Sequence, residues 1–358
     1  EFLNAAEGAA VLACAEAEDF TFAQVDDLGQ IEEKDFTDAH LDAVLALPTV
    51  DVEAVRAAGF KVALDAVNSV GGIIMPRLLE RMGVECVCVN CEPTGEFAHN
   101  PEPLPSNLVE LCEAVVANGA DFGISVDPDV DRLALICENG QPFGEEYTLV
   151  SVADYLLSRI YNEALETGKS IEEIAAPYQM VTSSNLSSSR ALRDVTEQYG
   201  GEYCTAAVGE VNVTTKMREA GALIGGEGNG GVIYPALHYG RDAMVGVALF
   251  LTNLAYKKMK VSELRASYPE YVIAKNKIEL SDSALIDRIL EEVKTVYAAE
   301  DINTIDGVKI SFEAKKEWVH LRRSNTEPII RIYAEAATAE AADALAQQII
   351  AIANKIIG

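Results

Sequence analysis

The sequence predicts an α/β protein with two successive doubly wound mixed α/β domains, followed by a small α+β C-terminal domain. Two observations lead to this fold class. From residue 61 onward, short apolar runs of strand length alternate with segments that carry apolar residues at helical spacing, and this alternation is typical of a mainly parallel sheet covered by helices. From about residue 268 the order changes, because several strand-like runs are accompanied by only two helical segments.

A chain of 358 residues is too long for one ordinary core, and roughly two to four domains are expected. We divide it at changes in composition and pattern. Residues 1–47 are rich in alanine and acidic residues, and we interpret them as the tail of a truncated first domain and a linker. The predicted parts are 1–47, a metal-loop α/β domain at 48–155, a sugar-recognition α/β domain at 156–266, and a phosphate-binding α+β domain at 267–358.

The elements of the first α/β domain follow from apolar spacing and from residues that end helices. A connecting helix at 38–47 ends before Pro48, and glycines close the next helices. Asn107 and Glu110 form a candidate cap pair. The predicted strands are 62–64, 84–89, 122–124 and 133–136, and the predicted helices are 71–82 and 107–118.

The second α/β domain repeats this order, which suggests duplicated domains. A helix at 149–160 leads into it, and the glycine-dense segment 225–231 is predicted to be a turn. Its predicted strands are 174–181, 202–208 and 232–234, and its predicted helices are 189–199, 213–220 and 242–259. In the last domain we predict strands at 272–280, 308–312, 318–321 and 329–334, and helices at 283–299 and 339–357.

Composition limits the partners. With 57 acidic and 28 basic side chains the formal charge is −29, which argues against nucleic acid or an anionic membrane surface as a partner. Apolar residues make up 49%, but no run could span a bilayer and no leader peptide is evident. We expect a soluble cytoplasmic protein, monomeric or weakly dimeric, and we expect local clusters of arginine and lysine to bind an anionic substrate.

Three of the seven cysteines, Cys86, Cys88 and Cys91, lie close together in the sequence. Cys88 and Cys91 have Cys-x-x-Cys spacing, but a zinc site needs two further soft ligands at matching spacing. We therefore expect reduced, largely buried thiols.

The segment 125–132 carries three carboxylates at alternate positions, Asp127, Asp129 and Asp131, followed at once by Arg132. Apolar runs on both sides indicate a tight loop at the end of a buried strand. Carboxylates at this density repel one another unless a hard cation lies between them, and Mg²⁺ accepts few protein oxygens while leaving positions for a substrate phosphate. We therefore predict that the three aspartates bind Mg²⁺.

Two other interpretations of this loop are weaker. The first is a solvated acidic loop. The second is a calcium-binding helix–loop–helix, since Asp127, Asp129, Asp131 and Glu138 stand at positions one, three, five and twelve. That loop requires glycine where Arg132 stands and a helix on each side, whereas both flanks here are predicted strands.

The segment 322–328, Arg-Arg-Ser-Asn-Thr-Glu-Pro, groups guanidinium, hydroxyl, amide and backbone donors on one turn. The guanidinium fork matches phosphate oxygens two at a time, so a phosphate site is predicted. The alternatives are an arginine-rich surface turn and, for Arg331, a structural pair with Glu335 or Glu327. The predicted phosphate ligands are Arg322, Ser324, Asn325, Thr326 and Arg331.

The glycine-dense segment 225–231 has a different chemistry. Glycines on both sides of Glu227 and Asn229 let the backbone approach a ligand, while a carboxylate and an amide can bind vicinal sugar hydroxyls. An ordinary hairpin or bulge explains the glycines equally well.

In their order along the chain and in their residues, the three segments resemble the α-D-phosphohexomutases, the phosphoglucomutase/phosphomannomutase family. The resemblance runs from about residue 61 to the C-terminus. The metal loop matches Asp-Pro-Asp-x-Asp-Arg and the phosphate loop matches Arg-x-Ser-Asn-Thr-Glu-Pro. It implies a catalytic role for Arg132, sugar binding by Glu227 and Asn229, and Mg²⁺ with a glucose 1,6-bisphosphate-type intermediate as cofactors.

Two departures from the family pattern matter. The sugar loop is usually Gly-Glu-x-Ser-Gly, and Asn229 replaces its hydroxyl here, which leaves the hexose preference open. The family's phosphoserine lies in a Thr-Ala-Ser-His-Asn-Pro loop, whereas the only similar string here, residues 97–101, has no serine before His99. We therefore expect the first domain to be mostly absent.

The resemblance implies a mutase that interconverts hexose 1-phosphate and 6-phosphate, of glucose or mannose, through a phosphoserine and a bound 1,6-bisphosphate. Without that serine, the chain alone is expected to be inactive. The alternative is a non-catalytic sugar-phosphate binding protein.

Overall fold

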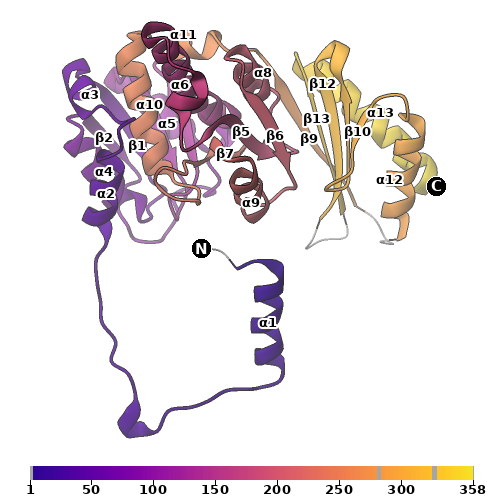
Figure 1. Cartoon of the computed structure of the whole chain (residues 1–358), viewed down its shortest axis with the longest axis horizontal. Helices are drawn as coiled ribbons and strands as arrows, with labels where there is room; N and C mark the ends of the chain where they lie inside the picture. The colour runs from indigo at the N-terminus through magenta and orange to yellow at the C-terminus, as the bar shows by residue number, and fades with distance from the viewer. Residues whose placement is uncertain (1–2, 280–283, 325–328, 358) are drawn as a thin grey trace.

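The computed structural model describes residues 3–279, 284–324 and 329–357, and these form three sheets that lie in a row along the longest axis of the molecule (Figure 1). Each sheet belongs to one predicted unit, so the predicted fold class is confirmed. No helix in the described ranges is both long and apolar enough to cross a membrane.

The first sheet has the order β2-β1-β3-β4. Strand β1 is parallel to β2 and β3, and β4 returns antiparallel to β3. Every residue of β3 and β4 is buried, which explains why both strands read as continuous apolar runs. The elements are β1 Lys61–Asp65, α4 Gly71–Arg81, β2 Glu85–Val89, α5 Val109–Asn118, β3 Phe122–Val126 and β4 Leu133–Cys137.

The second sheet has the order β6-β5-β7-β8, with the same strand directions as the first. The predicted repetition of architecture is therefore confirmed at the level of topology. The elements are α7 Ile171–Ala175, β5 Gln179–Asn185, α8 Ala191–Gln198, β6 Glu202–Ala206, α9 Glu210–Ala220, β7 Ala222–Glu227 and β8 Gly231–Ile233.

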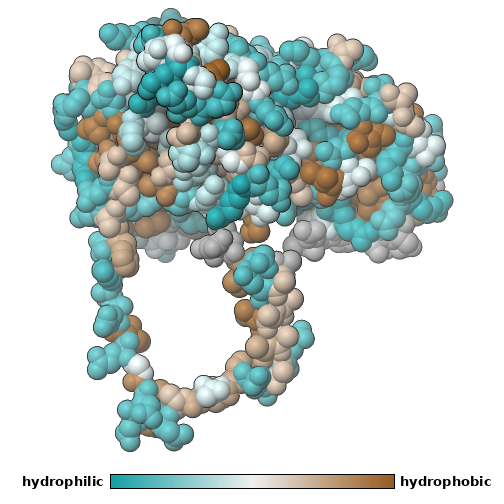
Figure 2. Space-filling model, viewed as in Figure 1, coloured by the Kyte–Doolittle hydropathy of each residue, from teal (hydrophilic) through white to brown (hydrophobic). Residues whose placement is uncertain are grey.

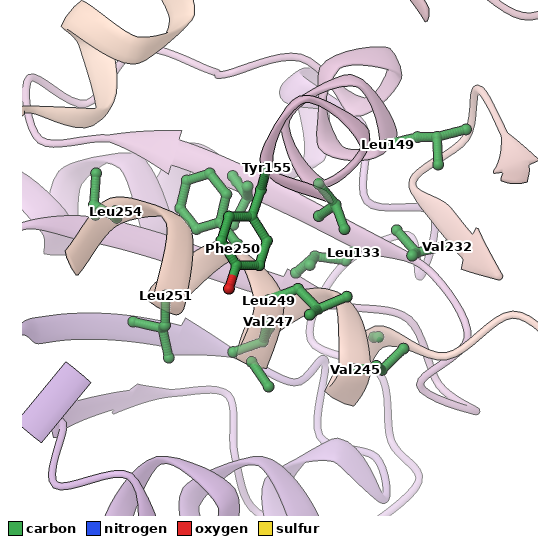
Figure 3. Close-up of a cluster of buried hydrophobic side chains, with 14 of the residues drawn as sticks. Leu133, Leu149, Tyr155, Val232, Val245, Val247, Leu249, Phe250, Leu251 and Leu254 are labelled. Carbon is green, nitrogen blue, oxygen red and sulfur yellow. The ribbon is translucent and has the colours of Figure 1, made fainter. Parts of the chain in front are cut away.

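Two long helices, α6 Glu145–Thr167 and α10 Ala243–Lys257, join these sheets into one body. They contact each other, and each also contacts β4 and β8. Apolar side chains of α10, such as Leu249 and Phe250, belong to the same buried cluster as Leu133 from the first sheet and Val232 from the second (Figure 3). One continuous hydrophobic cluster thus spans both units, and the predicted boundary at 155/156 lies inside α6. Helices α2 Thr37–Leu45, α3 Val52–Ala58 and α11 Val261–Ala266 complete this body.

The two sheets also meet through their backbones. Arg132 forms an isolated antiparallel bridge with Gly231, and the N–H of Leu133 donates to the carbonyl of Gly230 at 3.0 Å. Gly230 has φ +89, and a Cβ on it would lie 2.3 Å from the Leu133 carbonyl oxygen. Only glycine fits this close approach.

The third sheet is antiparallel, with the order β10-β11-β12-β13-β9, and has its own hydrophobic cluster. The two long helices of this unit pack against each other, and α13 also packs on β9 and β13. The elements are β9 Val272–Glu279, α12 Ala284–Val296, β10 Asp301–Asn303, β11 Val308–Phe312, β12 Glu317–Arg323, β13 Ile329–Ala336 and α13 Ala339–Ile357.

Most of the N-terminal segment loops away from these sheets, although its first described residues, such as Leu3 and Asn4, line a cavity together with residues of α9 (Figures 1 and 2). Helix α1 Ala5–Glu16 begins with a capping box in which the Asn4 side chain accepts from the Glu7 N–H, while the Glu7 carboxylate accepts from the Asn4 N–H. Extended chain and the short 3₁₀ turn Val25–Asp27 lead on to α2.

Several local predictions are wrong. The predicted strand 174–181 starts too early, because its first two residues end helix α7, which Ser170 caps by accepting from the Glu173 N–H, and the strand itself begins only at Gln179. Asn107 does not cap α5, since its side-chain amide donates to the Glu102 carbonyl. The predicted glycine turn is mostly strand, and β7 runs through to Glu227.

The predicted burial of the clustered cysteines is also wrong. All seven cysteines are free, but Cys88 is exposed, Cys86 and Cys91 are partly exposed, and only Cys137 is buried. The reason is topological, since β2 is the edge strand of its sheet.

We predict that Gly230→Ala destabilises the protein more than Gly168→Ala does. Gly168 also has a left-handed φ, +71, but nothing lies within 4 Å of its added Cβ. The control should lose about 1 kcal/mol of unfolding free energy from backbone strain. Gly230→Ala should lose at least about 1 kcal/mol more, because the Leu133 backbone must move. Urea unfolding measures both values, and equal losses would contradict the close approach.

Candidate functional site

The acidic loop connects β3 to β4 and is organised around Asp127, whose carboxylate is fully buried. Its Oδ1 accepts from the N–H groups of Asp131, at 3.1 Å, and of Arg132, at 2.9 Å. Its Oδ2 accepts from Arg132 Nε at 2.6 Å. Asp127 therefore fixes both the loop backbone and the arginine that follows the loop.

The three aspartates converge as predicted. One carboxylate oxygen from each of Asp127, Asp129 and Asp131 lies within 4.8 Å of the other two. Among the described residues, buried Asp131 Oδ1 has no hydrogen-bond partner. Burial, followed by the Asp127 carboxylate, raises the pKa of Asp131 to about 7, against the opposing effect of Arg241. A converging set of oxygens with one unsatisfied member fits a hard divalent cation.

Val130 lies in the middle of this loop with φ +62, which is unfavourable for a β-branched residue. Such a conformation costs about 1–3 kcal/mol and persists only where the surroundings impose it. Here the start of α10 imposes it, because the Ala243 N–H donates to the Val130 carbonyl at 3.1 Å.

Arg241 links the acidic loop to the glycine-dense segment, and sequence analysis missed it. Its Nη2 pairs with Asp131 Oδ2, its Nη1 lies 3.1 Å from Glu227 Oε2, and its Nε lies 3.0 Å from Glu210 Oε2. These partners come from three separate segments, so no local spacing pattern indicates the site.

Glu227 and Asn229 lie on the hairpin between β7 and β8. Glu227 is buried, and its Oε1 accepts from Asn185 Nδ2 at 2.9 Å. The side-chain oxygen of Asn229 accepts from the Gly231 N–H at 3.1 Å, and its amide nitrogen donates to Glu227 Oε2 at 3.5 Å, which leaves one amide hydrogen for a further acceptor.

One cleft of ≈ 290 Å³ collects predicted residues from all three units. The predicted residues that line it are Arg132, Glu227, Asn229, Arg322 and Arg331. A larger cavity of ≈ 930 Å³ lies beside α3 and α10, but its lining is mainly apolar and includes none of the predicted site residues that the structure describes. We therefore place the site in the smaller cleft, where charged groups converge.

The two predicted phosphate-binding arginines lie on neighbouring strands. Arg322 on β12 is paired directly with Arg331 on β13. Like charges at opposite positions destabilise a sheet unless something neutralises them. Within the part of the chain that the structure describes, buried Arg322 Nε has no hydrogen-bond acceptor. Two opposed guanidinium groups, one with an unsatisfied donor, suit a phosphate.

The remaining phosphate-loop predictions have different outcomes. Ser324 is buried at the end of β12, and its N–H donates to the Ile329 carbonyl at 3.0 Å. Asn325, Thr326 and Glu327 lie outside the described residues. Glu335, an alternative partner for Arg331, instead accepts from Trp318 Nε1 at 2.6 Å and from the Arg190 N–H at 2.9 Å.

The cleft also contains charged groups that sequence analysis missed. Lys275 Nζ lies 3.2 Å from Glu145 Oε1. Burial raises the pKa of Glu146 well above its usual range, although part of this side chain faces the cleft. The pair Glu145-Glu146 follows Gly144 at the start of α6, and that glycine was the only local signal of a functional turn.

Comparison with known proteins agrees with this arrangement. Residues 38–140, 152–271 and 276–352 match the family profiles for phosphoglucomutase/phosphomannomutase α/β/α domain II, α/β/α domain III and C-terminal domain, respectively. A phosphoglucomutase/phosphomannomutase from Thermococcus kodakarensis is 35% identical over 329 residues, which cover 91% of this chain and 67% of that protein. A phosphoglucosamine/phosphogalactosamine mutase from Sulfurisphaera tokodaii is 32% identical, over 85% of this chain and 64% of its own length.

A solved structure of a phosphoglucomutase/phosphomannomutase family protein from Burkholderia thailandensis has the same fold, with a TM-score of 0.80 at 24% identity over 99% of this chain and 70% of that one. The chain spans roughly two thirds of the length of these curated relatives. With all three described units matched, the chain belongs to the phosphoglucomutase/phosphomannomutase family.

Proposed function

We propose that this chain forms the metal-, sugar- and phosphate-binding part of a phosphohexomutase that interconverts hexose 1-phosphate and hexose 6-phosphate through a phosphoserine and a bound 1,6-bisphosphate. The observation that carries the proposal is the single cleft lined by Arg132, Glu227, Asn229, Arg322 and Arg331. A cation-binding loop beside a sugar-sized cleft with phosphate donors at the other wall suits a ligand with a hexose ring and a terminal phosphate.

Asp127, Asp129 and Asp131 would hold Mg²⁺, which when bound offsets negative charge on the phosphoryl group during transfer. Asp127 also orients Arg132, which lines the cleft and can bind a phosphate oxygen with its remaining N–H groups. Arg322 and Arg331 would bind the phosphate that does not react.

Glu227 and Asn229 would bind the sugar. Arg241 and Asn185 hold Glu227 in place, so its carboxylate is preorganised toward the cleft. A buried carboxylate can accept from hexose hydroxyls or from the ammonium group of an amino sugar. Because relatives include both phosphoglucomutase/phosphomannomutases and phosphoglucosamine mutases, we consider glucose, mannose and glucosamine phosphates together.

The residue that would carry the phosphoryl group is not among the residues of the cleft. The 358 residues contain no Thr-Ala-Ser-His-Asn-Pro string. His99, in the most similar string, lies with Nε2 3.1 Å from buried Asp65 Oδ2 and with Nδ1 2.8 Å from the Asn100 carbonyl oxygen. Both ring nitrogens are engaged within the first unit, which supports a structural role for His99.

We predict that this chain binds hexose phosphates and turns none over, because its cleft recognises sugar and phosphate but its sequence lacks the carrier serine. Calorimetry with the 1-phosphates of glucose, mannose and glucosamine, together with a mutase assay on the same sample, tests both parts. Absence of binding to all three sugar phosphates would contradict the proposed function. Binding with turnover would show that another residue carries the phosphoryl group.

Asp129→Asn should weaken Mg²⁺ binding by at least about tenfold, which corresponds to about 1.4 kcal/mol for a lost charged ligand. Asp129 is exposed, so the fold should be unaffected. Glu166→Gln, an exposed carboxylate at the far end of α6, is the matched control. Calorimetric titration with Mg²⁺ measures the change, and equal affinity in the two variants would refute this metal site.

Arg322→Ala should weaken hexose phosphate binding by about 1.5–3 kcal/mol, the usual loss for a charged hydrogen bond. The neighbouring Arg323→Ala serves as control, since Arg323 is exposed and pairs with Asp287 at 3.2 Å. In a complete enzyme, Arg322→Ala should raise KM with little change in kcat. The reason is that the phosphate that does not react is bound equally well in the ground state and in the transition state. The assignment fails if Arg323→Ala weakens binding as much as Arg322→Ala.

A further inference from the structure

Two of the four histidines in the sequence meet at one carboxylate outside the cleft. His40 Nε2, from α2, lies 2.8 Å from Asp242 Oδ2, and His238 Nε2, from the loop before α10, lies 3.0 Å from the same oxygen. The two ring centroids are 5.9 Å apart. Three metal-ligating atoms from two distant parts of the chain therefore lie within 4.8 Å of one another.

The carboxylate at the centre of this cluster is rigidly placed. Asp242 is only 3% exposed and caps α10, with Oδ1 accepting from the N–H groups of Met244, at 2.8 Å, and Val245, at 3.1 Å. The helix N-terminus therefore occupies Oδ1 and leaves Oδ2 directed at the two rings. A metal ligand oriented in this way by neighbouring groups is typical of protein metal centres.

Two of the three distances between the ligand atoms are close to those around a metal ion, and all three atoms lie within 4.8 Å of one another. With metal–ligand bonds of about 2.0–2.1 Å, neighbouring ligand atoms lie about 2.9 Å apart in octahedral geometry and about 3.3 Å apart in tetrahedral geometry. The distances of 2.8 and 3.0 Å from Asp242 Oδ2 to the two Nε2 atoms thus need shifts of only a few tenths of an ångström. The imidazoles are 29% and 43% exposed, so water can reach the fourth position.

We propose that His40, His238 and Asp242 form a second metal site, separate from the aspartate loop, that binds a borderline divalent transition metal of the Zn²⁺ class. Two imidazole nitrogens and one carboxylate oxygen plus water is a common zinc ligand set, whereas Mg²⁺ prefers oxygen ligands. On binding, each ring coordinates through Nε2 and carries its proton on Nδ1. The two hydrogen bonds to Asp242 are replaced by metal bonds.

The position of this site gives it a structural effect. A metal bound there would tie α2 to the start of α10. That same turn donates from Ala243 to Val130 in the aspartate loop, at 3.1 Å, and carries Arg241 toward the cleft. Occupancy of the second site would thus brace the turn on which the aspartate loop rests, without contributing a ligand to it.

The test is a titration of the metal-stripped full chain with Zn²⁺ in excess Mg²⁺, so that the aspartate loop is occupied, with Co²⁺ absorption as a spectroscopic readout of nitrogen ligands. We expect one Zn²⁺ per chain and a Zn²⁺-dependent rise in melting temperature, because the metal binds the folded state. His40→Gln and His238→Gln should each lower the affinity by more than about tenfold.

His99→Gln is the matched control, because it removes a histidine that contacts a different buried aspartate. It should retain Zn²⁺ binding and the melting shift. If His40→Gln weakens the attachment of α2 and unfolds the chain, His238→Gln, in an exposed loop, carries the test alone. Unchanged Zn²⁺ affinity in the folded histidine variants, or no Zn²⁺ bound by the parent chain, would overturn the proposal and leave the cluster as hydrogen bonds only.

Discussion

The close approach of Leu133 to Gly230 determines how the aspartate loop lies relative to the glycine hairpin. One backbone hydrogen bond of 3.0 Å and the adjacent Arg132–Gly231 bridge bring the end of the aspartate loop against the glycine hairpin. A single bond of this kind contributes only about 1 kcal/mol. Its importance is geometric, since the shared core around α6 and α10 holds the two sheets together and this contact fixes their register.

That register creates an electrostatic problem that Arg241 partly solves. Asp131, Glu210 and Glu227 surround one guanidinium group, and buried carboxylates are unfavourable unless they are paired. One positive charge cannot neutralise three negative ones. The excess negative charge lies on the side of the aspartate loop, where a bound cation would neutralise it. Arg241 and the loop metal would thus act as two halves of one arrangement.

The parts of this structure that sequence could predict are those encoded by neighbouring residues. The alternating aspartates and their two apolar flanks correspond to the loop between β3 and β4, because strand pattern and loop chemistry are both local. The repeated alternation of strands and helices was predictable for the same reason, whereas the order of the strands in each sheet was not. The prediction for the phosphate loop can be compared with the structure only at Arg322, Ser324 and Arg331, since the middle residues of the loop lie outside the described ranges.

The parts that sequence missed depend on distant contacts. Nothing near Arg241 reveals that Asp131 and Glu210 will surround it. The exposure of Cys88 follows from the edge position of β2, which the strand pattern does not encode. Helix α7, capped by Ser170, takes the first two residues of the predicted strand 174–181, so that strand begins later than its apolar run suggests. In each case tertiary position or a single capping hydrogen bond decided against local propensity.

The division of the hydrophobic cores has a consequence for motion. The two α/β units share one core, whereas the C-terminal sheet has its own. Contacts between them include polar ones, such as Lys309 Nζ to the Leu186 carbonyl at 2.7 Å and Arg190 to Glu313 at 2.9 Å. Interfaces with such polar contacts commonly allow relative motion of the units they join, and a shift of the C-terminal sheet would change the width of the cleft, since Arg322 and Arg331 lie on that sheet. The width of the cleft is then set by whichever ligand bridges its two walls.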